Sequence, residues 1–311
     1  MSEEFTELLS DLCDASSDVS VSALTDLSDL DDGDAGELAK RWAEIETDRR
    51  RWIVRELIDL AEDNVELNFN AVYLQSLDDG DAEIRRDSVR GLWEYEKPDV
   101  IPRLVSLMES DDDVAVRAEA AQALGRFVVA NANGGLRDRH FEAIEEGLKR
   151  VLANAAESID VLTRALESIG AHDAPWVRQG ISEAYESGDR RLKTSAVHAM
   201  GRSCESRWLP LVIREMTSDE PEVRYEAAIA AGSLADEAAV PRLIELTGDE
   251  DEEVAQASVS ALGEIGSVEA RRVLQEIVDG ESEALSEAAK AALAEIRFEE
   301  NPLSFGRPNA L

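Results

Sequence analysis

Small and apolar residues recur along this chain at a fixed interval of 31 residues. The clearest stretch is Glu220–Gly232 (EPEVRYEAAIAAG), with counterparts at Asp189–Gly201 and Asp251–Gly263. Looser copies occupy Ser158–Gly170 and Glu281–Ala294. A constant period in this range is typical of solenoid proteins, in which each helical unit stacks on the next.

The repeated stretch predicts the second of two helices in each unit. If Arg224 is position zero, the residue before it is apolar and those three and six positions after it are small, here Val223, Ala227 and Ala230. These offsets lie on one face of a helix, and small residues there indicate that neighbouring helices approach closely. The glycine eight positions on, Gly232 in this unit, predicts the left-handed residue that ends the helix.

The first helix of each unit is expected in the stretch before the second. Pro210 and Pro241 lie 31 residues apart, where the first turn of their helices is expected. The first turn of a helix does not use the N–H group that proline lacks. In the last four units the first helices are predicted near residues 174–186, 207–217, 238–247 and 268–278.

The regular pattern divides the chain into three parts. Residues 68–296 are expected to form about seven helix pairs, with an insertion near 127–139 that predicts a lengthened helix and a loop. Residues 1–67 do not keep the period and are expected to form an atypical helical capping segment, as terminal repeats of solenoids do. Residues 297–311 contain two prolines and a glycine and are expected to be a non-helical tail.

The motif Asp-x-x-Val-Arg-x-x-Ala-x-x-Ala-Leu-Gly at Asp113–Gly125, and its variant at Glu220–Gly232, resembles HEAT-like repeats of the phycobilin-lyase type. The whole chain also resembles uncharacterised bacterial HEAT-repeat proteins. The resemblance implies an all-α fold, a right-handed α-solenoid of antiparallel helix pairs whose second helices line the concave side. It also implies protein–protein scaffolding and, in some branches, chromophore attachment or DNA-base repair.

The most variable polar positions of the second helices lie one, five and nine residues after position zero and share one face. If the second helices line the concave side, as the resemblance implies, these positions form a groove. Arginine forks suit carboxylates and phosphates, so the groove would bind an acidic or phosphorylated protein segment. Alternatively, this is a solvated face whose arginines pair with neighbouring acids. The predicted partner-binding residues are Arg86, Arg90, Gln122, Arg126, His198, Arg202 and Tyr225.

The chain is strongly acidic, with 68 Asp and Glu against 32 Lys and Arg and a formal net charge of −36. Such a charge argues against binding nucleic acid or an anionic membrane, both of which need a basic surface. It therefore also opposes the DNA-repair branch. The acids are spread along the chain, which leaves open an adaptation to a salty cytoplasm or an outer surface that recruits a basic partner. No stretch is long and apolar enough to span a membrane, and no secretory leader is evident, so a cytoplasmic location is expected.

The sequence offers little for catalysis or metal binding. None of His140, His172 and His198 is followed by glutamate, whereas the metal-dependent hydroxylase branch of HEAT proteins uses His-Glu pairs. Cys13 and Cys204 are far apart and have no histidine close in sequence. There is no phosphate-binding glycine loop and no Gly-x-Ser-x-Gly motif. We therefore expect no catalytic residue, metal or cofactor.

Taken together, these features predict a non-catalytic scaffold that binds a protein or peptide along the groove of second helices. Two alternatives stay open. One is a lyase-like or other enzyme-associated HEAT-repeat subunit. The other is a structural module of a larger assembly that docks through its tryptophan-containing N-terminal segment.

Overall fold

The computed structural model describes residues 3–280 and 282–300, which form helices joined by turns, with no strand among them. The predicted all-α solenoid is confirmed. The chain divides into two compact units, Met1–Ser168 and Ile169–Leu311. None of the described helices is long and apolar enough to cross a membrane.

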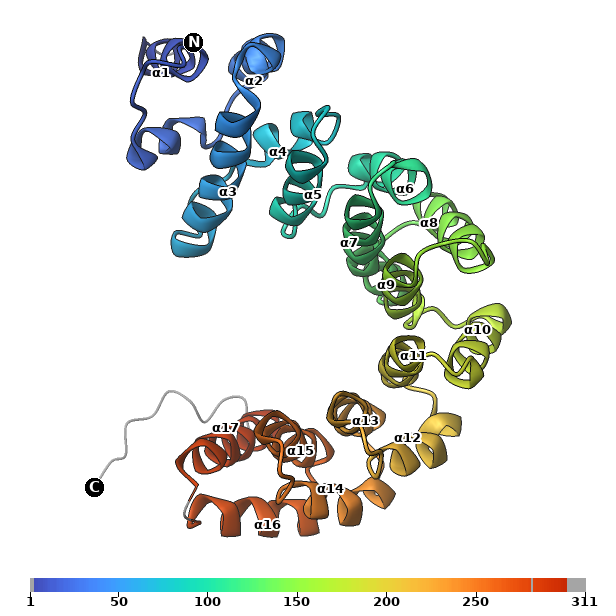
Figure 1. Ribbon diagram of the computed structural model, residues 1–311. Coiled ribbons are helices and arrows are strands. Elements are labelled where there is room, and N and C mark those ends of the chain that lie inside the picture. Colours follow the sequence, from blue (N-terminus) through green and yellow to red (C-terminus); the bar gives the residue numbers. More distant parts are fainter. Residues whose placement is uncertain (1–2, 281, 301–311) are drawn as a thin grey trace, which may run out of the picture. The chain divides into compact units, whose positions relative to one another are not determined.

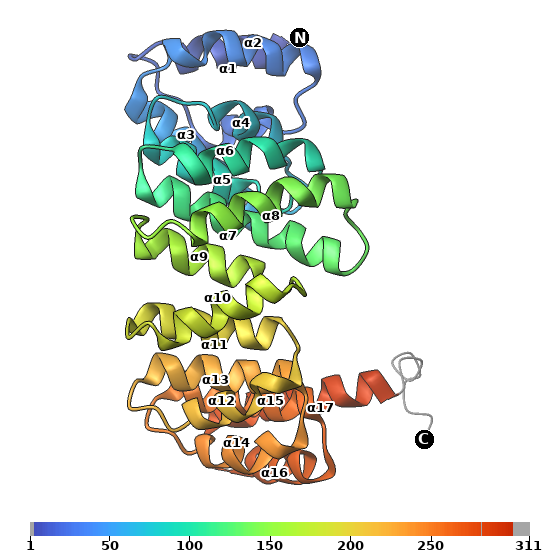
Figure 2. The ribbon, with the colours of Figure 1, turned by 90° about the vertical axis from the view of Figure 1, so that its right-hand side faces the viewer.

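In the first unit, an N-terminal segment is followed by three helix pairs. Figures 1 and 2 show α5, α7 and α9 side by side in one layer, with α4, α6 and α8 in the other. The N-terminal segment contains α1 (Glu3–Cys13), η1 (Val21–Leu27), α2 (Asp32–Arg41), η2 (Trp42–Glu44) and α3 (Thr47–Asp63). The pairs are α4 (Asn70–Ser76) with α5 (Ala82–Gly91), α6 (Ile101–Ser110) with α7 (Val114–Ala132), and α8 (Asp138–Leu152) with α9 (Ile159–Ile169), and η3 (Pro98–Val100) leads into α6.

The second unit contains four helix pairs with the same two-layer arrangement, and α11, α13, α15 and α17 form the layer of second helices. The pairs are α10 (Pro175–Glu186) with α11 (Arg190–Arg202), α12 (Leu209–Glu215) with α13 (Pro221–Leu234), α14 (Val240–Leu246) with α15 (Glu252–Ile265), and α16 (Val268–Val278) with α17 (Glu283–Glu300). Two short helices, η4 (Ser206–Trp208) and η5 (Glu237–Ala239), lead into α12 and α14.

The acid that begins most repeats is a helix cap. The Asp251 carboxylate accepts the main-chain N–H groups of Glu253 and Val254 at 3.0 and 3.3 Å. An aspartate in this position satisfies N–H groups that have no partner within the helix and favours the positive end of its dipole. The same cap is made by Asp81, Asp113 and Asp189.

The predicted apolar and small positions of the second helices form the core. The residues before position zero are buried at Ile84, Val116, Val161, Val223 and Val254. The small residues three positions after zero are buried at Ser88, Ala120, Ala165, Ala196, Ala227, Ser258 and Ala289.

In α11 and α13 the glycine eight positions after zero is not a left-handed residue that ends the helix, so the prediction is wrong there. Gly201 and Gly232 lie within α11 and α13. A Cβ atom on Gly201 would lie 2.7 Å from the Cα atom of Ala230 on the next second helix. The glycine therefore allows adjacent second helices to touch, which a side chain would prevent.

The left-handed residues occur three positions later than the glycine. They are Cys204, Ala235 and Gly266, with φ angles of 51°, 51° and 59°, and they follow one another at the repeat interval. Ala235 and Gly266 are the residues at which α13 and α15 end. Only one of the three is a glycine, so the sequence pattern alone hides this turn.

Two predicted boundaries can be compared with the helices. In the region of the predicted insertion, α7 continues to Ala132, and α8 begins at Asp138 after a turn in which Gly134 has a φ of 74°. At the C-terminal end, α17 continues to Glu300, so residues 297–300 are helical and the expected non-helical tail does not begin at 297. No helix-breaking residue occurs between Arg297 and Pro302, which explains the longer helix. Residues 301–311 of the expected tail lie outside the described residues.

The N-terminal segment is fastened to the first repeat by hydrogen bonds. The indole N–H of Trp42 and the guanidinium of Arg50 both donate to the buried carboxylate of Asp79, each at 2.7 Å. Arg49 on α3 donates to main-chain carbonyls that follow the end of α1, including those of Asp14 at 2.6 Å and Ser17 at 2.7 Å. These bonds join α1, α3 and the first repeat.

Candidate functional site

Adjacent repeats are joined by an arginine at position zero of the second helix. Arg224 on α13 donates from Nε and Nη2 to both carboxylate oxygens of Asp249, in the turn before α15, at 2.8 and 2.7 Å. Its Nη1 donates to the main-chain carbonyl of Ser218 at 2.9 Å. Asp249 in turn accepts the main-chain N–H of Asp251, the cap of α15. One arginine thus ties its own turn to the cap of the next repeat.

The same link recurs in the first unit. The carboxylate lies two residues before the next helix cap for Arg50 and Arg85, as it does for Arg224, and one residue before it for Arg117. Two repeats of the second unit have no arginine at position zero and no acid two residues before the next cap. In the second unit, Lys193 is at position zero of α11, and Ser218 is the residue two before the next cap. Likewise, Ala255 is at position zero of α15, and Gly280 is the residue two before the next cap. The first-unit pairs are Arg50 with Asp79, Arg85 with Asp111, and Arg117 with Glu157.

Two of the predicted groove arginines are neutralised by their neighbours. Arg86 Nη2 lies 2.7 Å from an Asp87 carboxylate oxygen. Arg90 is more exposed, and its Nη2 lies 3.5 Å from the Glu119 carboxylate on α7. At these positions the structure agrees with a solvated face of paired charges, the alternative left open by the sequence.

Arg126 is different, because its guanidinium is partly buried and unpaired. Its Nε and Nη2 are enclosed and have no hydrogen-bond partner among the described residues. The Phe127 ring centre lies 4.7 Å from Arg126 Cζ. Burial lowers the pKa of Arg126 to about 10, and the Glu96 carboxylate opposes that shift. The side chain therefore stays protonated at neutral pH although part of it has left water.

The other predicted residues lie on the same layer of helices within their own units. Gln122 is exposed on α7. In the second unit, His198 on α11 places Nδ1 3.0 Å from the Glu226 carboxylate on α13. Arg202 is exposed without an ion pair to a described residue, and Tyr225 is half-buried on α13. The predicted residues therefore fall into one set on α5 and α7 and another on α11 and α13.

Trp93 is a surface residue that the groove prediction did not include. Its side chain is 60% exposed, and it lies two residues after the end of α5 at Gly91. It occupies the offset that holds glycine in Gly125 and Gly201, where the helix packs against its neighbour. Because α5 ends at Gly91, Trp93 lies in the turn after the helix, where its indole is largely exposed to solvent. The departure from glycine at this offset was the signal that could have identified it.

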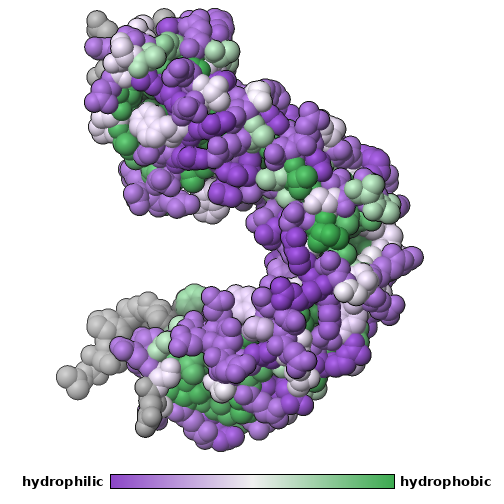
Figure 3. Space-filling view, viewed as in Figure 1, coloured by the Kyte–Doolittle hydropathy of each residue, from purple (hydrophilic) through white to green (hydrophobic). Residues whose placement is uncertain are grey.

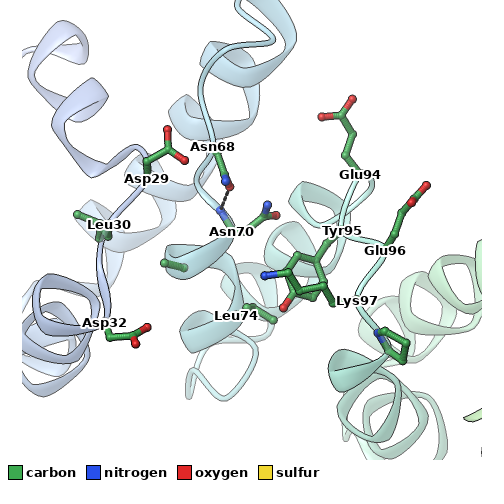
Figure 4. A pocket seen from close by; sticks show the side chains of 12 residues that line it. Asp29, Leu30, Asp32, Asn68, Asn70, Leu74, Glu94, Tyr95, Glu96 and Lys97 are labelled. Carbon is green, nitrogen blue, oxygen red and sulfur yellow. Dashed lines mark hydrogen bonds between the residues drawn. The ribbon is translucent and has the colours of Figure 1, made fainter.

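A pocket of about 760 Å³ opens in the first unit between the η1–α2 turn, the start of α4 and the turn that follows α5 (Figure 4). The Tyr95 hydroxyl donates to the Asp99 carboxylate at 3.0 Å, and burial together with Asp99 raises the pKa of Tyr95 to about 12. No histidine or cysteine lines this pocket, and Lys97 is the one cation in its lining. Its acidic residues are Asp29, Asp32, Glu94 and Glu96.

Metal binding has no evident site in residues 3–280 and 282–300, where no cluster of three or more His, Cys, Asp or Glu side chains could hold an ion. The visible face in Figure 3 is mainly hydrophilic, with small separate hydrophobic patches. The chemistry that the described residues offer is therefore charge pairing and aromatic contact on the helix surfaces.

One protein family and several solved structures are similar to this chain. The family described as HEAT repeats matches residues 70–136 and 209–294. The complex of CpcE and CpcF of phycocyanin lyase from Nostoc sp. PCC7120 is 18% identical, with a TM-score of 0.55, over 84% of this chain and 95% of that one. Human deoxyhypusine hydroxylase is 19% identical, with a TM-score of 0.37, over 89% of this chain and 96% of that one.

Curated protein sequences give no match. At such low identity, the likeness to the phycocyanin lyase complex shows the fold alone. The matched repeats and the stack of helix pairs together establish the family: this chain is a HEAT-repeat protein.

Proposed function

We propose that this HEAT-repeat protein is a non-catalytic scaffold that binds a protein segment across the exposed face of its second helices. The exposure of Trp93 is the observation that carries the proposal. Burying a large apolar side chain contributes roughly 2–3 kcal/mol, so an exposed tryptophan leaves a large binding contribution unused. Tryptophan and arginine are also the residues most enriched at the energetic centres of protein interfaces.

The helices next to Trp93 also support the second helices as the binding surface. Trp93 lies in the turn after α5, and α5 packs on α7, which carries Gln122 and Arg126. An exposed aromatic side chain combined with polar and arginine side chains is typical of a protein-binding surface. The net charge of −36 disfavours nucleic acid and anionic lipid as the bound partner.

The two alternatives have less support. A lyase-like subunit would need a pocket with converging reactive groups, and the acidic pocket near Tyr95 presents carboxylates, amides and one lysine. Docking through the N-terminal segment would need exposed aromatic residues there. Trp42 is instead buried and bonded to Asp79.

The proposal is tested by affinity capture from a native extract of the source organism at matched salt. Wild type is compared with Trp93→Ala and with Val268→Ser, which removes an exposed apolar side chain from a first helix, α16. We expect Trp93→Ala to lose the captured protein and Val268→Ser to retain it, with unchanged helical circular dichroism for both. Equal capture by all three proteins would contradict a binding role for this face.

A further inference from the structure

We infer that Arg126 is an anchor that takes up a carboxylate of the bound protein segment. The inference rests on the proposed function and adds the chemistry of the partner. It identifies the segment as acidic and places its contact on α7, within the first unit.

The first observation is that Arg126 is an exception among its neighbours. The second helices of the first unit, α5, α7 and α9, carry other arginines, and each of these lies within ion-pair distance of a carboxylate. Arg126 makes no such contact with a described residue. The paired arginines are Arg85, Arg86, Arg90, Arg117 and Arg164.

The second observation is the position of the guanidinium. Nε and Nη2 are enclosed and have no acceptor, while the side chain as a whole is half-buried, so solvent reaches the remaining nitrogen, Nη1. The Phe127 ring lies close to Cζ and favours a cation there. Enclosed donors without acceptors are unfavourable, because the group has lost water and gained no bond in return. A hydrogen-bond acceptor from a partner would therefore stabilise the Arg126 guanidinium.

A carboxylate fits this site better than other acceptors. It can receive two parallel hydrogen bonds from one arginine, the strongest arrangement available to the side chain. The carboxylate of the partner contacts the Arg126 Nη1 first. Rotation about the last side-chain bonds of Arg126 then brings a second N–H group within hydrogen-bond distance. Glu96 is an electrostatic neighbour of Arg126, and it repels a doubly charged phosphate more strongly than a singly charged carboxylate.

The chain's charge makes the site selective. With a net charge of −36, most of the surface repels an acidic segment, so nonspecific attraction is suppressed. An acidic segment can remain bound only where a cation is not already neutralised. Arg126 meets that condition on α7.

The test uses the full chain and a fluorescein-labelled, end-capped peptide of glutamates, with an all-glutamine peptide of equal length as the uncharged control. Binding is measured by fluorescence anisotropy at about 0.15 M salt, where surface charges more than about 8 Å apart are screened. The variants are Arg126→Gln, Arg126→Lys and the control Arg150→Gln. The control removes an exposed, paired arginine from the first helix α8.

We expect wild type and Arg150→Gln to bind the glutamate peptide and not the glutamine peptide. Arg126→Gln should bind it about tenfold more weakly, which corresponds to one lost charge-assisted bond, and Arg126→Lys should be intermediate. Arg126→Gln should melt at the same temperature as wild type or higher, because it removes an unpaired, partly buried charge.

Equal binding of the glutamate peptide by wild type and Arg126→Gln would overturn the inference. So would an absence of binding to wild type at about 1 mM peptide, or tighter binding of a phosphoserine peptide that depends on Arg126 in the same way. If Trp93→Ala loses the captured protein while Arg126→Gln retains both capture and peptide binding, the anchor fails and the scaffold function stands. If Trp93→Ala also retains capture, the proposed function fails.

Discussion

Arg224 on α13 holds both carboxylate oxygens of Asp249, in the turn before α15, with parallel hydrogen bonds of 2.8 and 2.7 Å. Both side chains are largely buried. The pair joins one repeat to the next at the point where Asp251 caps α15. Because each repeat of a solenoid is stabilised mainly by its neighbours, a bond across the repeat boundary contributes to the cooperativity of the whole stack.

Removing the arginine of this pair should destabilise the second unit. We expect Arg224→Met to lower the free energy of unfolding by about 3 kcal/mol, because it leaves the Asp249 carboxylate buried without its partner. Urea denaturation followed by circular dichroism measures the change. The control is Arg272→Met, which removes an exposed pair with Glu276 and should cost less than about 0.5 kcal/mol. Equal effects of the two variants would show that the repeat boundary gains nothing from the bond.

The same pair should make stability depend on pH in the acid range. The hydrogen bonds from Arg224 hold the pKa of Asp249 below its ordinary value. A carboxylate whose pKa is lower in the folded state stabilises the fold above its unfolded pKa, and that contribution is lost as the pH falls through the folded pKa. We therefore expect wild type to be more stable than Asp249→Asn at pH 7 and the difference to shrink steadily below about pH 4. A difference that stays constant down to pH 2 would contradict this assignment.

Gly201 should not tolerate a side chain, although it lies inside a helix. A Cβ atom there would lie 2.7 Å from the Ala230 Cα atom on the next second helix. We expect Gly201→Ala to destabilise the chain by about 1–3 kcal/mol, since the backbones must separate. Gly180→Ala is the matched control, because Gly180 lies within α10 with no atom close to its Cβ position. That change should stabilise by up to about 1 kcal/mol through helix propensity. If Gly201→Ala and Gly180→Ala shift the midpoint of unfolding in the same direction, Gly201 is not needed for close packing of the second helices.

Ala235 should be improved by glycine. It ends α13 with a φ of 51°, a conformation that costs residues with a side chain about 1–2 kcal/mol. We expect Ala235→Gly to raise the free energy of unfolding by about 1 kcal/mol, measured by urea denaturation. Ala291→Gly, the same change at an exposed position of α17, should lower it by about as much. If both variants lose stability, the left-handed turn is not the source of strain.

The repeat, the helix pairs and the buried positions were predictable because packing between helices imposes the 3.6-residue pattern on the sequence. The role of Gly201 was not predictable from the sequence. A glycine that ends a helix and a glycine that lets a neighbouring helix pack closely produce the same sequence pattern. The left-handed position was hidden for a related reason. Cys204 and Ala235 adopt it without being glycines.

The candidate site was less predictable than the fold. Arg90 and Arg126 both lie on the face of polar offsets, yet only Arg90 has a carboxylate within ion-pair distance. That difference depends on the three-dimensional positions of Glu119 and Glu96, and these positions cannot be deduced from the spacing of residues in the sequence. Trp93 was visible in the sequence as a departure from glycine, but its exposure follows from the packing of the helices.

Site-specific photo-crosslinking shows directly whether the face of the second helices binds a protein segment. A benzoylphenylalanine residue replaces Gln122 on α7 in one variant and Glu142 on α8, a first helix, in the other; both positions are exposed. After illumination in the native extract, we expect a discrete protein adduct from position 122 and none from position 142. An adduct from position 142 alone would contradict the claim and place the binding surface on the first helices.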